Sequence, residues 1–264
     1  MVNKDYIIPA LGGRLGNNMF MVANAYSRAL DYNKQMVIAK SQVMYEGNDY
    51  SQNMFRKFEF IETFDDNKNC NPGTPSDDKH TIYMGYFQNE QYFEKYSENI
   101  KCMFSPPLDF IKKIQTEIPI IFEKKVTVIN VRRGDYLIYS DYHPTVSPEY
   151  ILKALDQIPT TEHILVASDD IPWCKEHLNL PEAIYLEGWK SHEQLWIMAM
   201  CHNFVISNSS FSWWAAYLSR YTEKIVIAPE TWFGPSAPQD WKYIYCKGWT
   251  ILASYFNNGL IQPK

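Results

Sequence analysis

The chain has 264 residues, of which 46% are hydrophobic and 21% are charged, a balance typical of a globular protein with a sizeable core. Its formal net charge of −5 gives no basic field for a nucleic-acid backbone, so we expect no nucleic-acid partner. The five cysteines form no CxxC pair, which argues against a zinc ribbon and favours a reducing compartment.

No stretch of the sequence approaches the ~20 apolar residues that span a bilayer. The first residues also lack the long apolar run of a secretory signal. We therefore expect a cytoplasmic protein. Any association with the inner face of a membrane would be peripheral, through the substrate or partners.

In the first half, short apolar runs predict strands and one segment with an apolar face predicts a helix. The polar segment 65–79, with Asn, Asp, Pro and Gly, is typical of a surface loop. The predicted strands are residues 6–10, 35–39 and 81–86, and the predicted helix is 17–32.

In the second half, apolar strands alternate with helical segments, a pattern that predicts a doubly wound, mostly parallel sheet. One of these helices begins at Ser191-His192-Glu193-Gln194, a capping-box pattern. The predicted strands are residues 126–131, 163–168, 183–186, 204–207 and 224–228, and the helices are 148–158, 172–178, 191–202 and 209–220.

The segment 105–126, with Ser105-Pro106-Pro107 and a charged helix, is the expected domain boundary. We therefore predict an α/β protein with two Rossmann-like domains facing a cleft. The first domain, residues 1–115, would be the acceptor side, and the second, residues 116–264, would bind a nucleotide-linked sugar.

Polar clusters follow three of the predicted parallel strands. They are Arg132-Arg133-Gly134-Asp135, Ser168-Asp169-Asp170, and Ser207-Asn208-Ser209-Ser210. Open α/β sheets bind ligands at the carboxyl ends of their strands. Three clusters at one edge therefore predict a binding site.

The two arginines carry donors that match phosphate oxygens, and one of them could stabilise the charge of a pyrophosphate leaving group without a metal. The alternative is an ion-paired arginine couple in a loop. Asp169 or Asp170 could accept hydrogen bonds from guanine, although Asp170 is also a candidate helix N-cap. The sequence Ser168-Asp169-Asp170 lacks the spacing of a DxD metal motif, and we expect no metal.

Two strand-to-helix turns are candidate anion sites. In the segment 207–214, exposed amides and the helix dipole would favour an anion, while N-capping by Ser or Asn is a compatible alternative. The glycine-rich segment 11–18 follows a strand and opens a helix, but it matches neither the G-x-G-x-x-G nor the Walker pattern. Its glycines permit close approach of the backbone to a ligand.

Three segments together resemble the alpha-1,2-fucosyltransferases of glycosyltransferase family 11. They are residues 12–20 (GGRLGNNMF), 131–136 (VRRGDY) and 208–216 (NSSFSWWAA). Residues 85–88, 168–170 and 228–233 are similar to that family too. The matches run in order along most of the chain.

The resemblance implies a two-domain GT-B-type fold, GDP-fucose as donor, inversion at the anomeric carbon, and no required metal or other cofactor. It implies transfer to the 2-hydroxyl of a terminal galactoside in an oligosaccharide or glycolipid acceptor. It also implies that Arg132 contacts the pyrophosphate, Asp169 the guanine, and Ser209 and Ser210 the phosphate site. The other donor-binding residues predicted are Gly13, Arg14, Asn17, Asn130, Arg133, Asn208 and Phe211, with Arg14 and Asn17 across the cleft.

Asn130 departs from the family, which commonly has His at this position. A carboxamide can hydrogen-bond but does not titrate near neutrality, so Asn130 cannot act as a base. Asp135 is our candidate base for direct displacement, and its alternative role is to orient Arg132 or Arg133. Two rival functions are transfer from another GDP-deoxyhexose and a non-catalytic sugar- or nucleotide-binding module.

Overall fold

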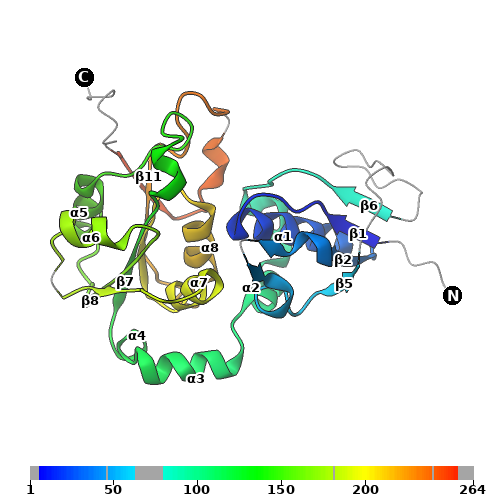
Figure 1. Cartoon of the computed structure of the whole chain (residues 1–264), viewed down its shortest axis with the longest axis horizontal. Coiled ribbons are helices and arrows are strands. Elements are labelled where there is room, and N and C mark those ends of the chain that lie inside the picture. The colour runs from blue at the N-terminus through cyan, green and yellow to red at the C-terminus, as the bar shows by residue number, and fades with distance from the viewer. Residues whose placement is uncertain (1–5, 46, 63–79, 181, 240, 255–264) are drawn as a thin grey trace. The chain divides into compact units, whose positions relative to one another are not determined.

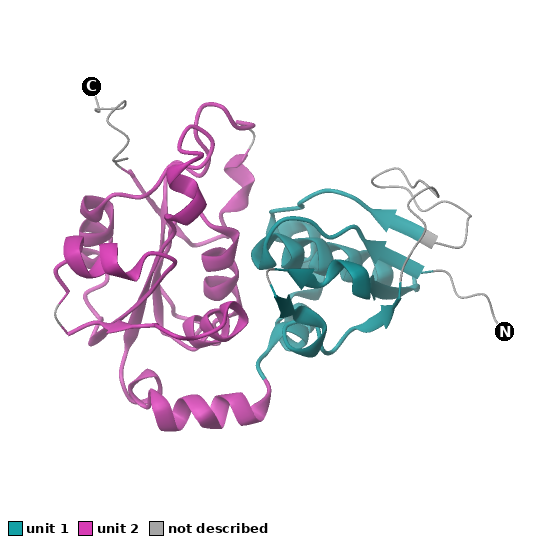
Figure 2. Ribbon diagram, in the orientation of Figure 1, with its two compact units in different colours: residues 1–106 teal, residues 107–264 magenta. Residues whose placement is uncertain are grey.

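The computed structural model describes residues 6–45, 47–62, 80–180, 182–239 and 241–254. The chain divides into two compact units, Met1–Pro106 and Pro107–Lys264 (Figure 2). This division falls inside the segment 105–126 but before the boundary predicted after residue 115. The loop expected at 65–79 lies outside the described residues.

The first unit is a parallel sheet packed against a long helix. Its main elements are β1 (Tyr6–Pro9), α1 (Leu15–Asp31), β2 (Gln35–Ala39), β3 (Met44–Tyr45), β4 (Asn48–Asp49), β5 (Glu59–Ile61), β6 (His80–Tyr83) and α2 (Ser97–Phe104). The strand order is β5-β2-β1-β6, and every pairing in this sheet is parallel (Figure 1). β1 is central, and Ile7 and Ile8 are buried in it. α1 packs on β1 and buries Met19 and Phe20.

The second unit is a larger α/β layer structure. Its elements are α3 (Leu108–Glu117), α4 (Ile120–Glu123), β7 (Val126–Val131), α5 (Pro148–Asp156), β8 (His163–Ser168), α6 (Ile171–His177), β9 (Ile184–Tyr185), α7 (Ser191–Ala199), β10 (Asn203–Val205), α8 (Ser210–Leu218), β11 (Val226–Pro229) and β12 (Thr250–Leu252). Its strands pair in parallel in the order β12-β11-β10-β7-β8-β9.

This strand order contains one reversal. From β7 the chain adds β8 and β9 on one side, and it then crosses to the other side of β7 to add β10, β11 and β12. The reversal between β7 and β10 is a topological switch point, where loops leave the sheet in opposite directions and open a crevice for a ligand. The order therefore singles out the loops after β7 and β10.

Helices cover both faces of this sheet. α5 and α6 lie on one face, and α7 and α8 lie on the other (Figure 1). The core under α5 and α6 joins Tyr150 to Val131, Val166 and Ile227. On the opposite side, α8 contributes the fully buried Trp213 and Trp214. Within the described residues, no helix combines the length and apolar character that a membrane span requires.

The predicted elements recur with small shifts. β2, β7 and β8 have the predicted bounds, and the four predicted helices of the second unit begin within one residue of the positions expected. β6 ends before the predicted residue 86, at Tyr83, and the backbone soon turns at Phe87, whose φ is 49°. The cap of α7 is also shifted by one residue, because Lys190 N donates to Glu193 Oε2 over 2.9 Å. β5 and β12 were not predicted.

Candidate functional site

The loop after β7 is built around two ion-paired arginines. Arg132 Nη1 lies 2.8 Å from Asp169 Oδ2, and Arg132 Nη2 donates to Asp135 Oδ1. The side chain of Arg132 is 18% exposed. Its guanidinium has five N–H donors, and these two pairs engage one Nη each, so donors remain for an anion. The ion-paired couple that the sequence left as an alternative is therefore present, and it holds Arg132 in one orientation.

Asp169 is directed toward this loop from the end of β8. Besides Arg132, it accepts a hydrogen bond from Arg133 N over 2.8 Å through Oδ1. Gly134 packs so closely that a Cβ atom there would lie 2.6 Å from Asp169 Oδ2. The backbone of the β7 loop and the Asp169 carboxylate therefore fit together only while residue 134 has no side chain.

Arg133 is directed toward α6. Its Nε lies 3.0 Å from Asp170 Oδ2, and its guanidinium carbon lies 3.9 Å from the centre of the Trp173 ring. Asp170 also caps α6, because its Oδ1 accepts from Trp173 N over 3.2 Å. The capping role considered for Asp170 is thus confirmed, and Arg133 joins the β7 loop to the start of α6.

The loop after β10 is neutral and buried. Asn130, on β7, donates to Ala167 O over 3.1 Å and accepts from Ser207 Oγ over 3.0 Å. Ser209 caps α8, because its Oγ accepts from Phe211 N over 3.3 Å. Ser212 donates to two carbonyls of the same loop. The hydrogen bonds of this loop therefore join β7, β8 and α8 at the switch point.

Asn208 bridges this loop to its surroundings. Its Nδ2 donates to Trp232 O over 2.9 Å, and its backbone oxygen accepts from Tyr136 Oη over 3.1 Å. Its side-chain oxygen is buried and has no partner among the described residues. A buried acceptor without a partner costs stability, so Asn208 Oδ1 is suited to accept a hydrogen bond from a ligand.

An aromatic cluster borders the β7 loop and was not predicted residue by residue. The Tyr136 ring lies 5.4 Å from the guanidinium carbon of Arg132 and stacks on His143 with 4.5 Å between ring centres. Phe233 also packs against His143, with 5.5 Å between ring centres. Burial lowers the pKa of His143, and Arg132 lowers it further while Asp135 raises it. In the sequence, Tyr136 and Phe233 lie in the family-like segments 131–136 and 228–233, and Tyr is abundant in the segment that follows Tyr136.

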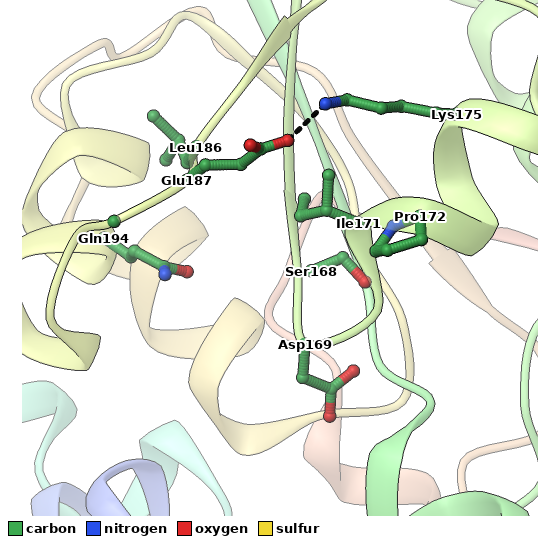
Figure 3. Close-up of a pocket in the computed structure, with 9 residues that line it drawn as sticks. Ser168, Asp169, Ile171, Pro172, Lys175, Leu186, Glu187 and Gln194 are labelled. Carbon is green, nitrogen blue, oxygen red and sulfur yellow. Dashed lines mark hydrogen bonds and ion pairs between the residues drawn. The ribbon is translucent and has the colours of Figure 1, made fainter.

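A pocket of about 530 Å³ opens beside Asp169 (Figure 3), within the range of small-molecule sites. It lies between the ends of β8 and β9 and the first turns of α6 and α7. Lys175 and Glu187 form an ion pair in its lining. The sequence predicted a binding role for Asp169, at one end of the pocket, but gave no indication of Lys175 and Glu187. The lining is Ser168, Asp169, Ile171, Pro172, Lys175, Leu186, Glu187, Gly188 and Gln194.

In the first unit, the glycine-rich turn leads from β1 into α1. Gly13 has φ +75°, and a Cβ atom there would lie 2.7 Å from Asn17 Nδ2. Asn17 accepts from Gln88 Nε2 over 2.7 Å, and Arg14 is the exposed N-cap residue of α1. Gly13, Arg14 and Asn17 therefore lie at the start of α1, in the strand-to-helix turn that the sequence predicted, and their contact with a donor stays a prediction.

The charges around Arg132 do not add up to a positive field. Two arginines face three carboxylates, from Asp135, Asp169 and Asp170, which leaves the cluster one unit negative. An anion would therefore be held by directional donors, namely the Arg132 guanidinium and the backbone amides at the start of α8. Among the described residues, no three His, Cys, Asp or Glu side chains group as metal ligands would.

Comparison with known proteins identifies the kind of protein that carries this site. The family model described as Glycosyl transferase family 11 matches residues 48–253. An alpha-1,2-colitosyltransferase of Escherichia coli is 25% identical over 268 residues, which cover 86% of this chain and 92% of that protein. The O-antigen biosynthesis glycosyltransferase WbnK of Escherichia coli is 27% identical over 57% of this chain, and the match spans 54% of WbnK.

Solved structures agree on the fold. The crystal structure of NodZ alpha-1,6-fucosyltransferase, co-crystallized with GDP, aligns with a TM-score of 0.57 and 12% identity over 81% of this chain and 92% of that chain. The expected α/β fold of GT-B type, with two Rossmann-like units, is thereby confirmed. Since the family model covers more than half of the sequence, including the loops after β7, β8 and β10, the chain belongs to glycosyl transferase family 11.

Proposed function

We propose that this glycosyltransferase moves L-fucose from GDP-fucose to the 2-hydroxyl of a terminal galactoside in a glycan, with inversion and without a metal. The observation that carries the proposal is Arg132, whose guanidinium is held by two carboxylates at the switch point, beside the start of α8. Family membership supports sugar transfer. The 1,2 linkage is supported by the name of the Escherichia coli colitosyltransferase, and the donor by the GDP co-crystallized with a fucosyltransferase of the same fold.

In this proposal the acceptor oxygen attacks the anomeric carbon of fucose from the face opposite GDP. The new carbon–oxygen bond forms as the bond to the β-phosphate oxygen breaks, and the electron pair leaves with GDP. Arg132 donates to the diphosphate as its charge grows, while the hydroxyls of Ser209 and Ser210 offer donors at the start of α8. Because Arg132 is already oriented, little reorganisation accompanies the reaction.

The remaining predicted residues take supporting roles. Asn130 and Asn208 shape the floor of the crevice through their hydrogen bonds. Arg133 fixes the β7 loop to α6 and stays a candidate donor-binding residue. Gly13, Arg14 and Asn17 are proposed to contact the donor from the first unit. Asp135 orients Arg132 and accepts the acceptor proton late in the displacement.

A second candidate differs only in the sugar. The Escherichia coli colitosyltransferase matches this chain over 92% of its own length, and Asn130 departs from the usual family residue. Another GDP-deoxyhexose is therefore the alternative donor. It would be distinguished by direct competition between GDP-fucose and GDP-colitose for one acceptor.

The test is product analysis with the full chain. The protein is incubated with labelled GDP-fucose and a panel of galactosides, with and without EDTA, and the product linkage is assigned by NMR. We expect an α-1,2-linked product, unaffected by EDTA, and none from a 2-deoxygalactoside control. Saturable donor binding without label transfer to any acceptor would favour the non-catalytic module, and transfer only from another deoxyhexose donor would favour the alternative above.

A further inference from the structure

The pocket beside Asp169 contains two carboxylates, and they differ in what they already contact. Each oxygen of Asp169 holds one bond to the β7 loop, to Arg132 Nη1 at 2.8 Å and to Arg133 N at 2.8 Å. Gly134 also covers Oδ2 at close range. If Asp169 turned to a base in the pocket, Arg132 would lose one of its two partners. Its position therefore suits orientation of Arg132 better than reading of a base.

Glu187 is in the opposite situation. It follows β9 and lines the pocket, and among the described residues its carboxylate forms an ion pair with the ammonium of Lys175, which lies on α6. Both side chains are more than half exposed, at 54% and 52%. Exposed pairs of this kind contribute little to the stability of the fold. A ligand can therefore recruit both groups at small cost. Figure 3 shows the pair at one end of the drawn residues and Asp169 at the other.

The chemistry of the pair matches one nucleobase. Guanine presents an acceptor, O6, next to two donors, N1–H and the 2-amino group. An ammonium can donate to O6, and a carboxylate can accept from both donors. Adenine presents a donor and an acceptor at the same positions, so it would meet Lys175 and Glu187 with the wrong polarity.

Resting on the GDP-sugar function proposed above, we propose that Glu187, with Lys175 beside it, is the residue that selects guanine, and that Asp169 is a positioning residue for Arg132. The base lies in the pocket between β8 and β9, and the diphosphate extends past Asp169 to Arg132 at the switch point. The specificity for the base and the stabilisation of the leaving group are then carried by different carboxylates.

The experiment compares binding of GDP and IDP by calorimetry, since IDP lacks only the 2-amino group. The wild-type chain should bind GDP about tenfold more tightly than IDP, the effect of one hydrogen bond to a charged acceptor. In Glu187→Gln, GDP affinity should fall about tenfold and the preference for GDP over IDP should shrink to less than about threefold. Glu176→Gln, at an exposed residue next to Lys175 on α6, is the matched control and should leave both affinities unchanged.

Asp169→Asn distinguishes the role of Asp169 from that of Glu187. This substitution should weaken the binding of GDP and of IDP by the same factor and slow sugar transfer, while the preference for GDP over IDP stays intact. Loss of the preference in Asp169→Asn, whether or not Glu187→Gln also loses it, would overturn the assignment, as would an unchanged preference in Glu187→Gln. In those cases GDP binding by the wild-type chain still stands, so the proposed function survives. Absence of GDP binding by the wild-type chain would end both proposals.

Discussion

The loops after β7 and β10 leave neighbouring strands of one sheet, yet they are stabilised in different ways. The β7 loop is charged and partly exposed, and ion pairs to Asp135, Asp169 and Asp170 hold its two arginines. The β10 loop is neutral, and Ser207, Asn208 and Ser209 are buried in it. The difference indicates a division of tasks. The β10 loop is a buried, rigid part of the fold, whereas the β7 loop presents charged groups whose positions depend on a few pairwise contacts.

The largest effect is expected from Arg132→Ala. Removing a donor aimed at developing charge typically costs about 10²–10³ in turnover, and we expect a loss of that size in transfer from GDP-fucose. Arg132→Lys should recover little, because an ammonium cannot reproduce two directed Nη contacts. Initial rates measured by mass spectrometry of the product provide the check. Arg28→Lys, at a half-exposed helix position in the first unit, is the control, and near-wild-type turnover of Arg132→Ala would remove Arg132 from the mechanism.

A smaller loss is expected from Gly134→Ala. The new Cβ would lie 2.6 Å from Asp169 Oδ2, so the carboxylate must move away from Arg132. The displaced group is the end of a side chain, so the free energy of unfolding should change little while turnover falls about 10–10²-fold. A double-mutant cycle sharpens the test: in an Asp169→Ser background the glycine substitution should add little. Full additivity of the two losses would show that Gly134 does not act through Asp169.

Asp135→Asn should cost less again. The amide keeps an oxygen that can accept from Arg132 Nη2, so Arg132 stays oriented, and we expect turnover to fall about tenfold with GDP affinity near wild type. Comparing the Kd for GDP with kcat separates orientation of Arg132 from proton transfer. A loss beyond about 10³ at unchanged affinity would mean that the proton must go to Asp135 and that the orienting role is secondary.

In the β10 loop, a substitution should affect stability more than turnover. Ser212 Oγ is buried and donates to Ser207 O over 3.1 Å and to Ser209 O over 3.0 Å. Ser212→Ala should lower the free energy of unfolding by about 1 kcal/mol, as expected for a buried hydrogen bond. Turnover per folded molecule should change less than about twofold, because both carbonyls keep other donors. Urea denaturation alongside initial rates decides this, and a large catalytic loss at full stability would contradict the division between the loops.

Much of the fold followed from local patterns. β7 and β8 are short apolar runs with abrupt polar ends, and both have the predicted bounds. β12 could not be predicted because its residues, Thr250–Leu252, are mostly exposed and form a strand only by pairing with β11. The cap of α7 was misplaced because Ser191 and Gln194 match the capping pattern whereas Lys190 does not, and the contact that shows the N-cap at Lys190 is its backbone N–H donating to Glu193.

The contacts of the site were predictable where the interacting residues are close together in the sequence. Arg132 and Asp135 are three residues apart and form an ion pair, and Ser209 caps the helix that follows it. The contacts of Asp169 were not predictable, because they join loops separated by 36 residues through Arg133 N. Glu187 gave no signal at all, since a lone exposed Glu after a two-residue strand has no motif around it.

The smallest effect expected is a dependence of the free energy of unfolding on pH, which we expect to arise from buried histidines and not from the charged β7 loop. Burial lowers the pKa of His143, His192 and His202 in the folded chain. Below the ordinary value of about 6.5 the unfolded chain therefore binds more protons than the folded one, and the free energy of unfolding must fall as the pH falls from about 7 toward 5. Urea denaturation at several pH values measures this slope. His192 is 9% exposed and packs against Trp196, so His192→Phe should flatten the slope, whereas His177→Gln, at an exposed position, should not. A slope unchanged in His192→Phe would assign the pH response to His143 or His202, and a slope that then flattened in His143→Phe would place it at the border of the β7 loop and weaken the separation of scaffold from charged loop.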